Sequence, residues 1–448
     1  MSKQLLSCLS LCLLGFTAQA QWVNQPIGFA PNNAPFYIDA IDANTAWTVG
    51  NGFLTGAYAQ PQVARTVNAG QTWTVTNLPV QTSAEEDFTA LSAISASMAW
   101  VTTTVGGAGG RILKTTDGGL TWTTQSGPTV YGNSNSYPDL IHFFSATDGV
   151  TVGDAVNPSS PLEIFTTTNG GLTWTPVTNS PVAMRNEFPV ATPPAVVGNH
   201  IWFVTQQGRV YHSPDKGLTW TVAAVGNGLM SGTSLVFRDL QNGLLCSLDD
   251  TGTSHELYRT TDGGATWGSI AYNGPLHGLG LSTVPGSNLY VSTGSDIGNG
   301  DQGSSYSRDN GQTWVSLEST LNHITTEFVS PAVGWSTSFS LTAGQLVGGA
   351  NRFSGTLLAT RPDAALQASL SVAPNPALGG LFTLQTACPG GSGAATVRIL
   401  DVAGRLVQQR TWAGTAPLAF DLSQEPAGLY VLEVQAASGT ARQKVVVQ

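Results

Sequence analysis

The chain has 448 residues, a formal net charge of −10 and only 10% charged residues. Its 17 lysine and arginine residues form no cluster, which excludes the basic surface that sequence-independent nucleic-acid binding requires. Glycine is abundant at 52 residues, no long segment shows helical periodicity, and the length exceeds one ordinary core. We therefore expect an all-β protein of more than one domain, built from short strands and glycine-rich turns, with no nucleic-acid partner.

The N-terminus has the pattern of a secretory signal peptide over residues 1–20. Lys3 supplies the positive charge, residues 5–16 are apolar, and residues 18–20 (AQA) form a small-x-small cleavage site. A buried strand or a membrane anchor are the alternatives, but the apolar run is too short to span a bilayer. We predict cleavage before Gln21 and export, with no transmembrane segment in the mature chain.

Two of the four cysteines, Cys246 and Cys388, remain after the predicted cleavage. They fall in different domains of the division given below, so two unpaired and mostly buried thiols are favoured over a disulfide between them. The fold must then be held together by its core.

An eight-residue pattern, (S/T)-x-(D/N)-x-G-x-T-W, occurs six times, and its tryptophans follow one another at steps of 49, 52, 46, 47 and 47 residues. The acidic or amide residue accepts backbone N–H bonds within a tight turn, and the glycine supplies a positive φ. The threonine and tryptophan then begin the outgoing strand. The turn residues are Asn68, Asp117, Asn169, Asp215, Asp262 and Asp309, and the tryptophans are Trp73, Trp122, Trp174, Trp220, Trp267 and Trp314.

These six segments resemble the Asp-box, or BNR repeat, of β-propellers. The best overall resemblance is to the photosystem II assembly-factor-like propellers, within a superfamily that includes sialidases and sortilin-type receptors. The resemblance implies that the boxes are structural and lie away from the active face, so we assign no catalytic role to their aspartates. It also implies a protein-binding platform, although the photosynthetic role should not transfer to an exported chain.

An apolar strand with a bulky residue precedes each box, and there are seven such strands for six boxes. A worn seventh box at Ser354 and Gly355 is one interpretation. The other places the missing strand at the N-terminus, because Trp22 stands 51 residues before Trp73 and opens a similar sequence. We predict a seven-bladed propeller over residues 21–360, with the N-terminal strand completing the last blade and removing an exposed sheet edge.

The chain changes character after the repeats. Residues 361–369 are expected to form a linker, and residues 370–448 contain alternating strands separated by Pro, Gly and Asp turns, a pattern typical of a small Ig-like β-sandwich. This segment resembles the type A sorting domain of the type IX secretion system, on the residues Pro374, Asn375, Pro376, Gly404, Gly428, Tyr430 and Lys444. The resemblance implies transfer by the type IX machinery to the cell surface or the medium, and removal of the domain. An attached adhesive module is the alternative.

In propellers, ligands usually meet the face where the innermost strands begin. The positions expected there, in the loop after each box strand, are Tyr37, Glu86 with Asp87, Tyr137 with Asp139, Arg185 with Glu187, Met230, His277 and His323. As the ligand-binding rim we select Tyr37, Glu86, Tyr137, Arg185, His277 and His323. An ordinary solvated rim is the alternative.

Two functions remain open. The first is a monomeric, secreted or cell-surface binding protein for an extracellular protein or glycan, with no catalytic residue, no metal and no cofactor. The second is a secreted glycoside hydrolase or lyase, for which Glu86, Asp139 and Glu187 are the candidate carboxylates by position. A sialidase is disfavoured because Arg185 is the only arginine at a rim position. The histidines show no zinc-binding spacing.

Overall fold

The computed structural model describes residues 21–51, 60–79, 86–105, 108–158, 160–225, 233–248, 255–296, 300–342, 345–355, 357, 364–386, 395–401, 406–412, 416–436 and 439–448. The chain divides into two compact units, Met1–Thr356 and Leu357–Gln448. Expectations for the signal peptide at residues 1–20, Met230, Cys388 and Gly404 lie outside the described residues. Cys246 is a buried free thiol.

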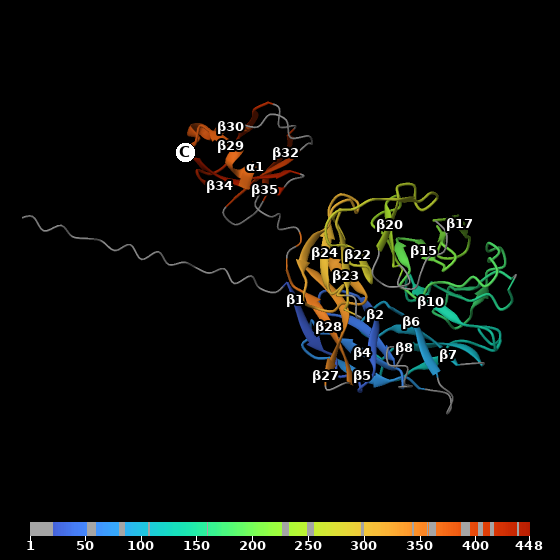
Figure 1. Ribbon diagram of the computed structural model, residues 1–448. Coiled ribbons are helices and arrows are strands. Elements are labelled where there is room, and N and C mark those ends of the chain that lie inside the picture. The colour runs from blue at the N-terminus through green and yellow to red at the C-terminus, as the bar shows by residue number, and fades with distance from the viewer. Residues whose placement is uncertain are drawn as a thin grey trace, which may run out of the picture. The chain divides into compact units, whose positions relative to one another are not determined.

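The first unit is a ring of seven four-stranded antiparallel sheets, which we number as blades 1 to 7 (Figure 1). The strands of each blade are given from the innermost outward. Blade 1 contains β2 (Ala34–Ala40), β3 (Ala46–Asn51), β4 (Gln62–Thr66) and β5 (Thr74–Asn77), and blade 2 contains β6 (Glu86–Ala93), β7 (Ala99–Val105), β8 (Gly109–Thr115) and β9 (Thr123–Thr124). Blade 3 contains β10 (Pro138–Phe143), β11 (Gly149–Gly153), β12 (Glu163–Thr167) and β13 (Thr175–Pro176). Blade 4 contains β14 (Ala195–Val197), β15 (His200–Val204), β16 (Arg209–Ser213) and β17 (Thr221–Ala224), and blade 5 contains β18 (Ser234–Phe237), β19 (Gly243–Leu248), β20 (His255–Thr260) and β21 (Gly268–Ser269). Blade 6 contains β22 (Gly280–Thr283), β23 (Tyr290–Gly294), β24 (Gly303–Ser307) and β25 (Val315–Glu318). Blade 7 combines β26 (Thr326–Ser330), β27 (Val333–Thr342) and β28 (Gln345–Phe353) with the N-terminal β1 (Trp22–Pro26).

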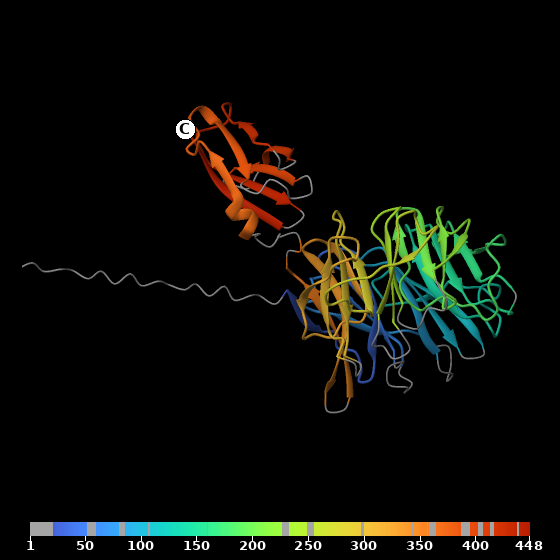
Figure 2. The ribbon, with the colours of Figure 1, turned by 45° about the horizontal axis from the view of Figure 1, so that its top comes forward.

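The N-terminal strand closes the ring, as the spacing of Trp22 predicted. β1 pairs antiparallel with β28 from Trp22 opposite Phe353 to Pro26 opposite Gly349. In Figure 1 the blue β1 lies beside the orange β28, so the two ends of the propeller share one sheet. The β27–β28 hairpin is the longest of the propeller and reaches past its neighbours in Figure 2.

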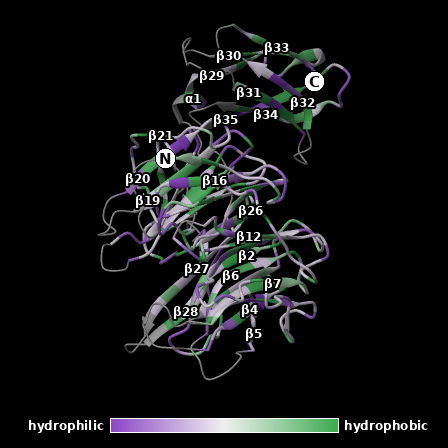
Figure 3. Ribbon diagram, turned by 90° about the vertical axis from the view of Figure 1, so that its right-hand side faces the viewer, coloured by the Kyte–Doolittle hydropathy of each residue, from purple (hydrophilic) through white to green (hydrophobic). Residues whose placement is uncertain are grey.

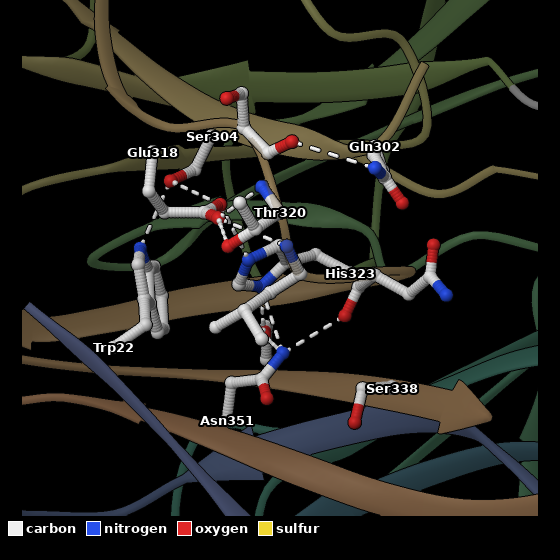
Figure 4. A network of polar contacts seen from close by, with 12 residues as sticks. Trp22, Gln302, Ser304, Glu318, Thr320, His323, Ser338 and Asn351 are labelled. Atoms are coloured by element: carbon white, nitrogen blue, oxygen red, sulfur yellow. Dashed lines mark hydrogen bonds and ion pairs between the residues drawn. The ribbon is translucent and has the colours of Figure 1, made fainter. Parts of the chain in front are cut away.

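Trp22 anchors this closure. Its side chain is 1% exposed and packs against the rings of Phe328 and Phe353 of the same blade. Its indole nitrogen donates to the Ser304 hydroxyl in blade 6 at 3.0 Å. Figure 4 shows Trp22 at the edge of a buried polar network centred on His323. The N-terminal strand therefore joins blades 6 and 7.

The six boxes form the turns between the third and fourth strands. In blade 2, Asp117 accepts hydrogen bonds from the Thr121 amide and hydroxyl at 2.9 and 2.6 Å and from the Thr115 hydroxyl at 2.8 Å. The Thr115 oxygen in turn accepts the Gly119 amide at 2.9 Å, and Gly119 has a φ of 88°. The short polar side chain thus replaces the backbone bonds that the turn lacks.

The bulky strands recognised before each box are the second strands of their blades, not the innermost ones. Their tryptophans pack under the box of the next blade: Trp100 donates to Gly170 O at 3.2 Å, and Trp202 donates to Gly263 O at 2.9 Å. Both tryptophans are fully buried. Apolar clusters fill the spaces between successive blades, and Figure 3 shows the hydrophobic residues concentrated on the strands.

The second unit is a small sandwich of two antiparallel sheets, in the orders β29-β30-β33 and β32-β31-β34-β35. Its elements are α1 (Ala364–Ser369), β29 (Leu370–Ala373), the 3₁₀ turn η2 (Leu378–Gly380), β30 (Leu381–Thr386), β31 (Ala395–Leu400), β32 (Leu406–Trp412), β33 (Leu418–Asp421), β34 (Gly428–Ala436) and β35 (Gly439–Val447). α1 falls within the expected linker, but it belongs to the sandwich: Gln367 exchanges two hydrogen bonds with the Arg442 backbone, at 2.7 and 2.8 Å.

Candidate functional site

The propeller has two chemically different ends. The box turns bond to the turns between first and second strands, as in Gly118 N to Ser97 O at 2.9 Å and Gly170 N to Thr147 O at 2.8 Å. We call this end the box face. The opposite end, where the innermost strands begin, is the loop face. The expected rim therefore lies on the face away from the boxes.

A cavity of about 240 Å³ runs between the innermost strands of all seven blades. Two carboxyls line it, Asp39 of blade 1 and Glu327 of blade 7. Asp39 Oδ2 accepts the Ala93 amide of blade 2, and Glu327 Oε2 accepts the Ala40 amide of blade 1, both at 2.7 Å. In blades 2 and 6 the hydroxyls of Ser92 and Ser282 accept equivalent bonds from the following blade. The central side chains thus connect neighbouring blades.

These two carboxyls are harder to ionise than ordinary acids. Burial raises the pKa of Asp39 to about 7, against the lowering effect of its backbone hydrogen bond. Burial and the charge of Asp39 raise the pKa of Glu327 to about 8. Burial also lowers the pKa of His142, which lines the same cavity, to about 4. Near neutral pH this cavity therefore carries less charge than its composition suggests.

Two carboxylates expected at the rim, Glu86 and Glu187, are buried in ion pairs. Arg111 donates to Glu86 through Nε at 2.9 Å and through Nη2. Arg209 donates to Glu187 through Nε at 2.8 Å and through Nη2 at 2.5 Å. Burial alone would raise the pKa of Glu187, but hydrogen bonds from Arg209 and Thr205 lower it below its ordinary value. Glu86 and Glu187 are therefore each enclosed with an arginine of their own.

The two histidines expected at the rim are also buried. His277 Nδ1 lies 2.9 Å from Asp301 Oδ1. Burial alone would raise the pKa of Asp301, but its hydrogen bonds and charge interactions with His255 and His277 lower it to about 2. His323 is fully buried between Glu318, at 3.1 Å, and the Ser336 hydroxyl, at 2.6 Å (Figure 4). Burial lowers the pKa of His323 despite Glu318. Both histidines complete internal networks and do not form part of a solvated ring.

Three other expected residues converge. Tyr37, Tyr137 and Asp139, from blades 1 and 3 and the loop between blades 2 and 3, line one cavity of about 80 Å³ together with Phe88. Burial, the charge of Asp154 and a hydrogen bond with Asp154 raise the pKa of Asp139 well above its ordinary value. Burial raises the pKa of Asp154 itself to about 6. Blade 3 thus holds two carboxyls that burial makes harder to ionise than ordinary acids, beside aromatic rings.

Arg185 is exposed, on the loop between blades 3 and 4. Residues of this loop that were not singled out from the sequence are also exposed, namely the apolar Val182, Met184 and Phe188. Their exposure could not be read from composition, because apolar residues in a loop usually turn inward. Among the residues that the structure describes, no three His, Cys, Asp or Glu side chains are arranged to hold a metal ion, and no helix is long and apolar enough to cross a bilayer.

In the second unit, the expected sorting residues come together at the C-terminal strand. Asn375 Nδ2 donates to Lys444 O at 2.6 Å, and Asn375 Oδ1 accepts the Val446 amide at 2.9 Å. The Tyr430 ring is buried, and its hydroxyl donates to Pro426 O at 2.7 Å. The segment around Pro374 and Pro376 is therefore tied to β35.

Residues 371–448 match the family model of the secretion system C-terminal sorting domain. The second unit is a type IX sorting domain. The sorting domain directs the chain to the cell surface or the extracellular space, as the sequence predicted.

The propeller resembles solved structures in fold alone. YCF48 bound to D1 peptide has a TM-score of 0.52 and 16% identity, over 74% of this chain and 94% of that chain. YCF48 from Cyanidioschyzon merolae has a TM-score of 0.50 and 17% identity, over 74% and 98%. A mutant Trypanosoma rangeli sialidase has a TM-score of 0.41 and 10% identity, over 92% and 83%. No curated protein matches this sequence.

Proposed function

We propose that the protein is an exported binding propeller whose loop face holds a protein or glycan ligand. The observation that carries the proposal is a rigid loop that presents Val182, Met184 and Phe188 to solvent. Large apolar side chains exposed together beside a cavity are typical of interaction sites, and methionine, arginine and aromatic residues are enriched at interfaces.

The buried Glu187 holds this loop in place. It accepts the Met184 amide at 2.6 Å and the Thr205 hydroxyl at 2.6 Å, while Arg209 also donates to Val182 O at 3.1 Å. Phe188 N donates to the Gln206 side chain at 2.9 Å. A loop held by so many bonds loses little conformational entropy when a ligand binds, which favours affinity.

The same loop borders the cavity of blades 1 to 3. Val182 forms an isolated bridge with Pro161 of blade 3, and Ala191 lines the cavity with Tyr137 and Asp139. The exposed side chains and the cavity therefore belong to one continuous part of the loop face. A propeller of similar fold, YCF48, binds a peptide, which supports the idea that such a ring can present a peptide-binding face.

The hydrolase alternative has less support in the geometry. Glycoside hydrolysis needs one ionised and one protonated carboxyl on either side of a bound sugar. Glu86 and Glu187 are enclosed with arginines, which leaves Asp139 as the candidate acid. We further propose that the six turns are Asp-boxes, that the signal peptide is cleaved before Gln21, and that the mature protein is a monomer whose sorting domain is removed on export.

The experiment measures binding and turnover in parallel on the mature chain. Glycan and peptide arrays report binding, and a polysaccharide panel reports hydrolysis. We expect binding that Phe188→Ala or Tyr137→Ala weakens at least tenfold, without turnover. Leu172→Ala is the matched control, since Leu172 is exposed on a turn of the box face. Hydrolysis abolished by Asp139→Asn would instead establish the enzyme, and equal loss with Leu172→Ala would move the binding site to the box face.

A further inference from the structure

The cavity of about 80 Å³ on the loop face combines aromatic rings with one acid. Its lining residues are Phe36, Tyr37, Phe88, Thr89, Tyr137, Asp139 and Ala191. A single water needs only about 10–15 Å³ of such space, so the cavity can hold several non-hydrogen atoms of a ligand. It is large enough for the end of one side chain and too small for a folded element.

Two buried polar atoms at this cavity are not fully satisfied. The Tyr37 hydroxyl has no hydrogen-bond partner among the described residues, and Asp139 Oδ2 has none there apart from the proton that Asp139 and Asp154 can share. Tyr37 is 7% exposed and Asp139 is 4% exposed. A buried polar group without a partner costs about 1–3 kcal/mol, which a ligand group could recover.

Comparison among the blades shows why blade 3 is different. The first residue of a box is Thr115 in blade 2, Thr167 in blade 3 and Ser213 in blade 4. Four residues before it stand Arg111, Glu163 and Arg209, respectively. The register confirms that these are equivalent positions: Thr103 pairs with Arg111, and Gly153 pairs with Glu163. In blades 2 and 4 the arginine at this position neutralises a buried carboxylate.

Blade 3 therefore carries three acids where its neighbours carry an ion pair. The pKa values of Asp139, Asp154 and Glu163 are shifted by burial, by the interactions of these acids with one another and by the Ser136 hydroxyl. No cation is among the groups that shift them. A buried negative charge without a counter-ion is strongly unfavourable. Of these three acids, Asp139 lines the cavity.

We propose that this cavity receives the ammonium or guanidinium group of a lysine or arginine side chain of a protein ligand. The ligand's cation takes the place that Arg111 and Arg209 occupy in the adjacent blades. The rings of Tyr37, Phe88 and Tyr137 add cation–π attraction, worth about 0.5–2 kcal/mol in such sites. The inference rests on the proposed function and specifies the chemistry of the ligand.

Binding exchanges a cation for a proton. Whichever of Asp139 and Asp154 holds a proton ionises as the ligand's cation enters, and the proton passes to solvent. Affinity should therefore rise with pH through about 6, the pKa of Asp154. The other titratable groups that face this pair, directly or through their charge, are Tyr37, Tyr131, Tyr137, Asp87 and Glu163. Burial raises the pKa of Glu163 as well, so its ionisation changes the affinity in the same direction.

The test compares two pools of random octapeptides on the mature chain, which differ only at one fixed central residue. That residue is lysine in one pool and norleucine in the other, so the pools differ by one ammonium group. We expect the lysine pool to bind at least tenfold more tightly at pH 7.5, and this preference to shrink at pH 5. Equal binding of the pools would overturn the inference while leaving the proposed function intact.

Matched variants separate the cavity from general attraction to an acidic protein. Glu163→Arg should supply an internal cation and so remove the preference for lysine. Asp139→Asn should remove the preference as well, because it takes away the carboxyl that lines the cavity. Glu256 is the exposed equivalent of Glu163 in blade 5, so Glu256→Arg and Glu256→Gln make the same charge changes elsewhere and should leave the preference unchanged. Tyr37→Phe, which removes only the hydroxyl, should weaken lysine-pool binding several-fold.

Each outcome decides the question. A preference that survives in folded Glu163→Arg and Asp139→Asn proteins, judged by their melting temperatures, would overturn the inference. If the parent protein binds neither pool but binds chitosan, an amine-bearing glycan, the protein ligand is wrong and the binding function stands. If the parent protein binds no peptide and no glycan, both proposals fail together.

Discussion

Replacing Trp22 with alanine tests whether the N-terminal strand holds the ring closed. An indole removes about 200 Å² of surface from water, worth about 5 kcal/mol at 25 cal/mol per Å². Alanine keeps part of that burial, and buried tryptophans cost about 3–5 kcal/mol when truncated. Trp22 is 1% exposed and also loses its bond to Ser304, so we expect a loss of about 4 kcal/mol in unfolding free energy.

The assay is equilibrium urea unfolding of the mature chain, followed by tryptophan fluorescence and far-UV circular dichroism. Val23→Ala is the matched control, because Val23 is the next residue of β1 and is 49% exposed. It should cost about 0.5 kcal/mol or less. Deleting residues 21–30 should leave the β28 edge unpaired and promote association, which a synthetic peptide of that sequence should reverse.

Two results would refute the closure reasoning. One is a Trp22→Ala protein that unfolds at the same urea concentration as the parent. The other is a Val23→Ala protein that loses as much stability as Trp22→Ala, because the effect would then come from the strand and not from the buried indole.

Three further predictions concern the turns, the central cavity and the sorting domain. Asp309→Ala removes the acceptor of hydrogen bonds from Ser307 and Thr313 and should lower the unfolding free energy by about 1 kcal/mol. Asp309→Asn should leave the unfolding free energy nearly unchanged, because two boxes carry asparagine at this position. Urea unfolding measures both effects. The raised pKa values of Asp39 and Glu327, about 7 and about 8, mean that the folded protein holds protons that the unfolded chain releases near pH 4. Stability should therefore fall between pH 4 and 8 and then level off, and Asp39→Asn with Glu327→Gln should flatten this slope in melting temperature; a slope unchanged in the double variant would contradict the assignment. Asn375→Ala loses both bonds to β35 and should retain the protein inside the cell on fractionation, while the exposed Ser371→Ala should be exported normally.

The ring could be predicted from the sequence because its repeats encode local chemistry. The (D/N)-x-G turn needs only neighbouring residues, so the boxes and their spacing locate blades 1 to 6. Trp22 could be matched to the missing strand because it keeps the same spacing. The second strands were recognised as well, but their order within the blade was not, because strand order depends on pairing and not on residue type.

The candidate site was harder to predict because burial and partners depend on distant residues. Glu86 and Glu187 were expected in loops, yet Glu86 begins β6, and each meets an arginine more than 20 residues away along the chain. A signal was present: Arg111 and Arg209 stand four residues before their boxes, where the other four boxes have Gln62, Glu163, Glu256 and Gly303. Counting back from each box would have singled out the two arginines, but not the carboxylates that they meet.

Amide hydrogen exchange with the lysine-centred octapeptide pool tests the central claim, binding at the loop face, most directly. We expect slower exchange in the segments that carry Tyr37, Asp139 and Phe188, with no change in the box turns around Leu120 and Leu172. Protection confined to the box turns, or the absence of protection at the loop face under saturating pool, would contradict it.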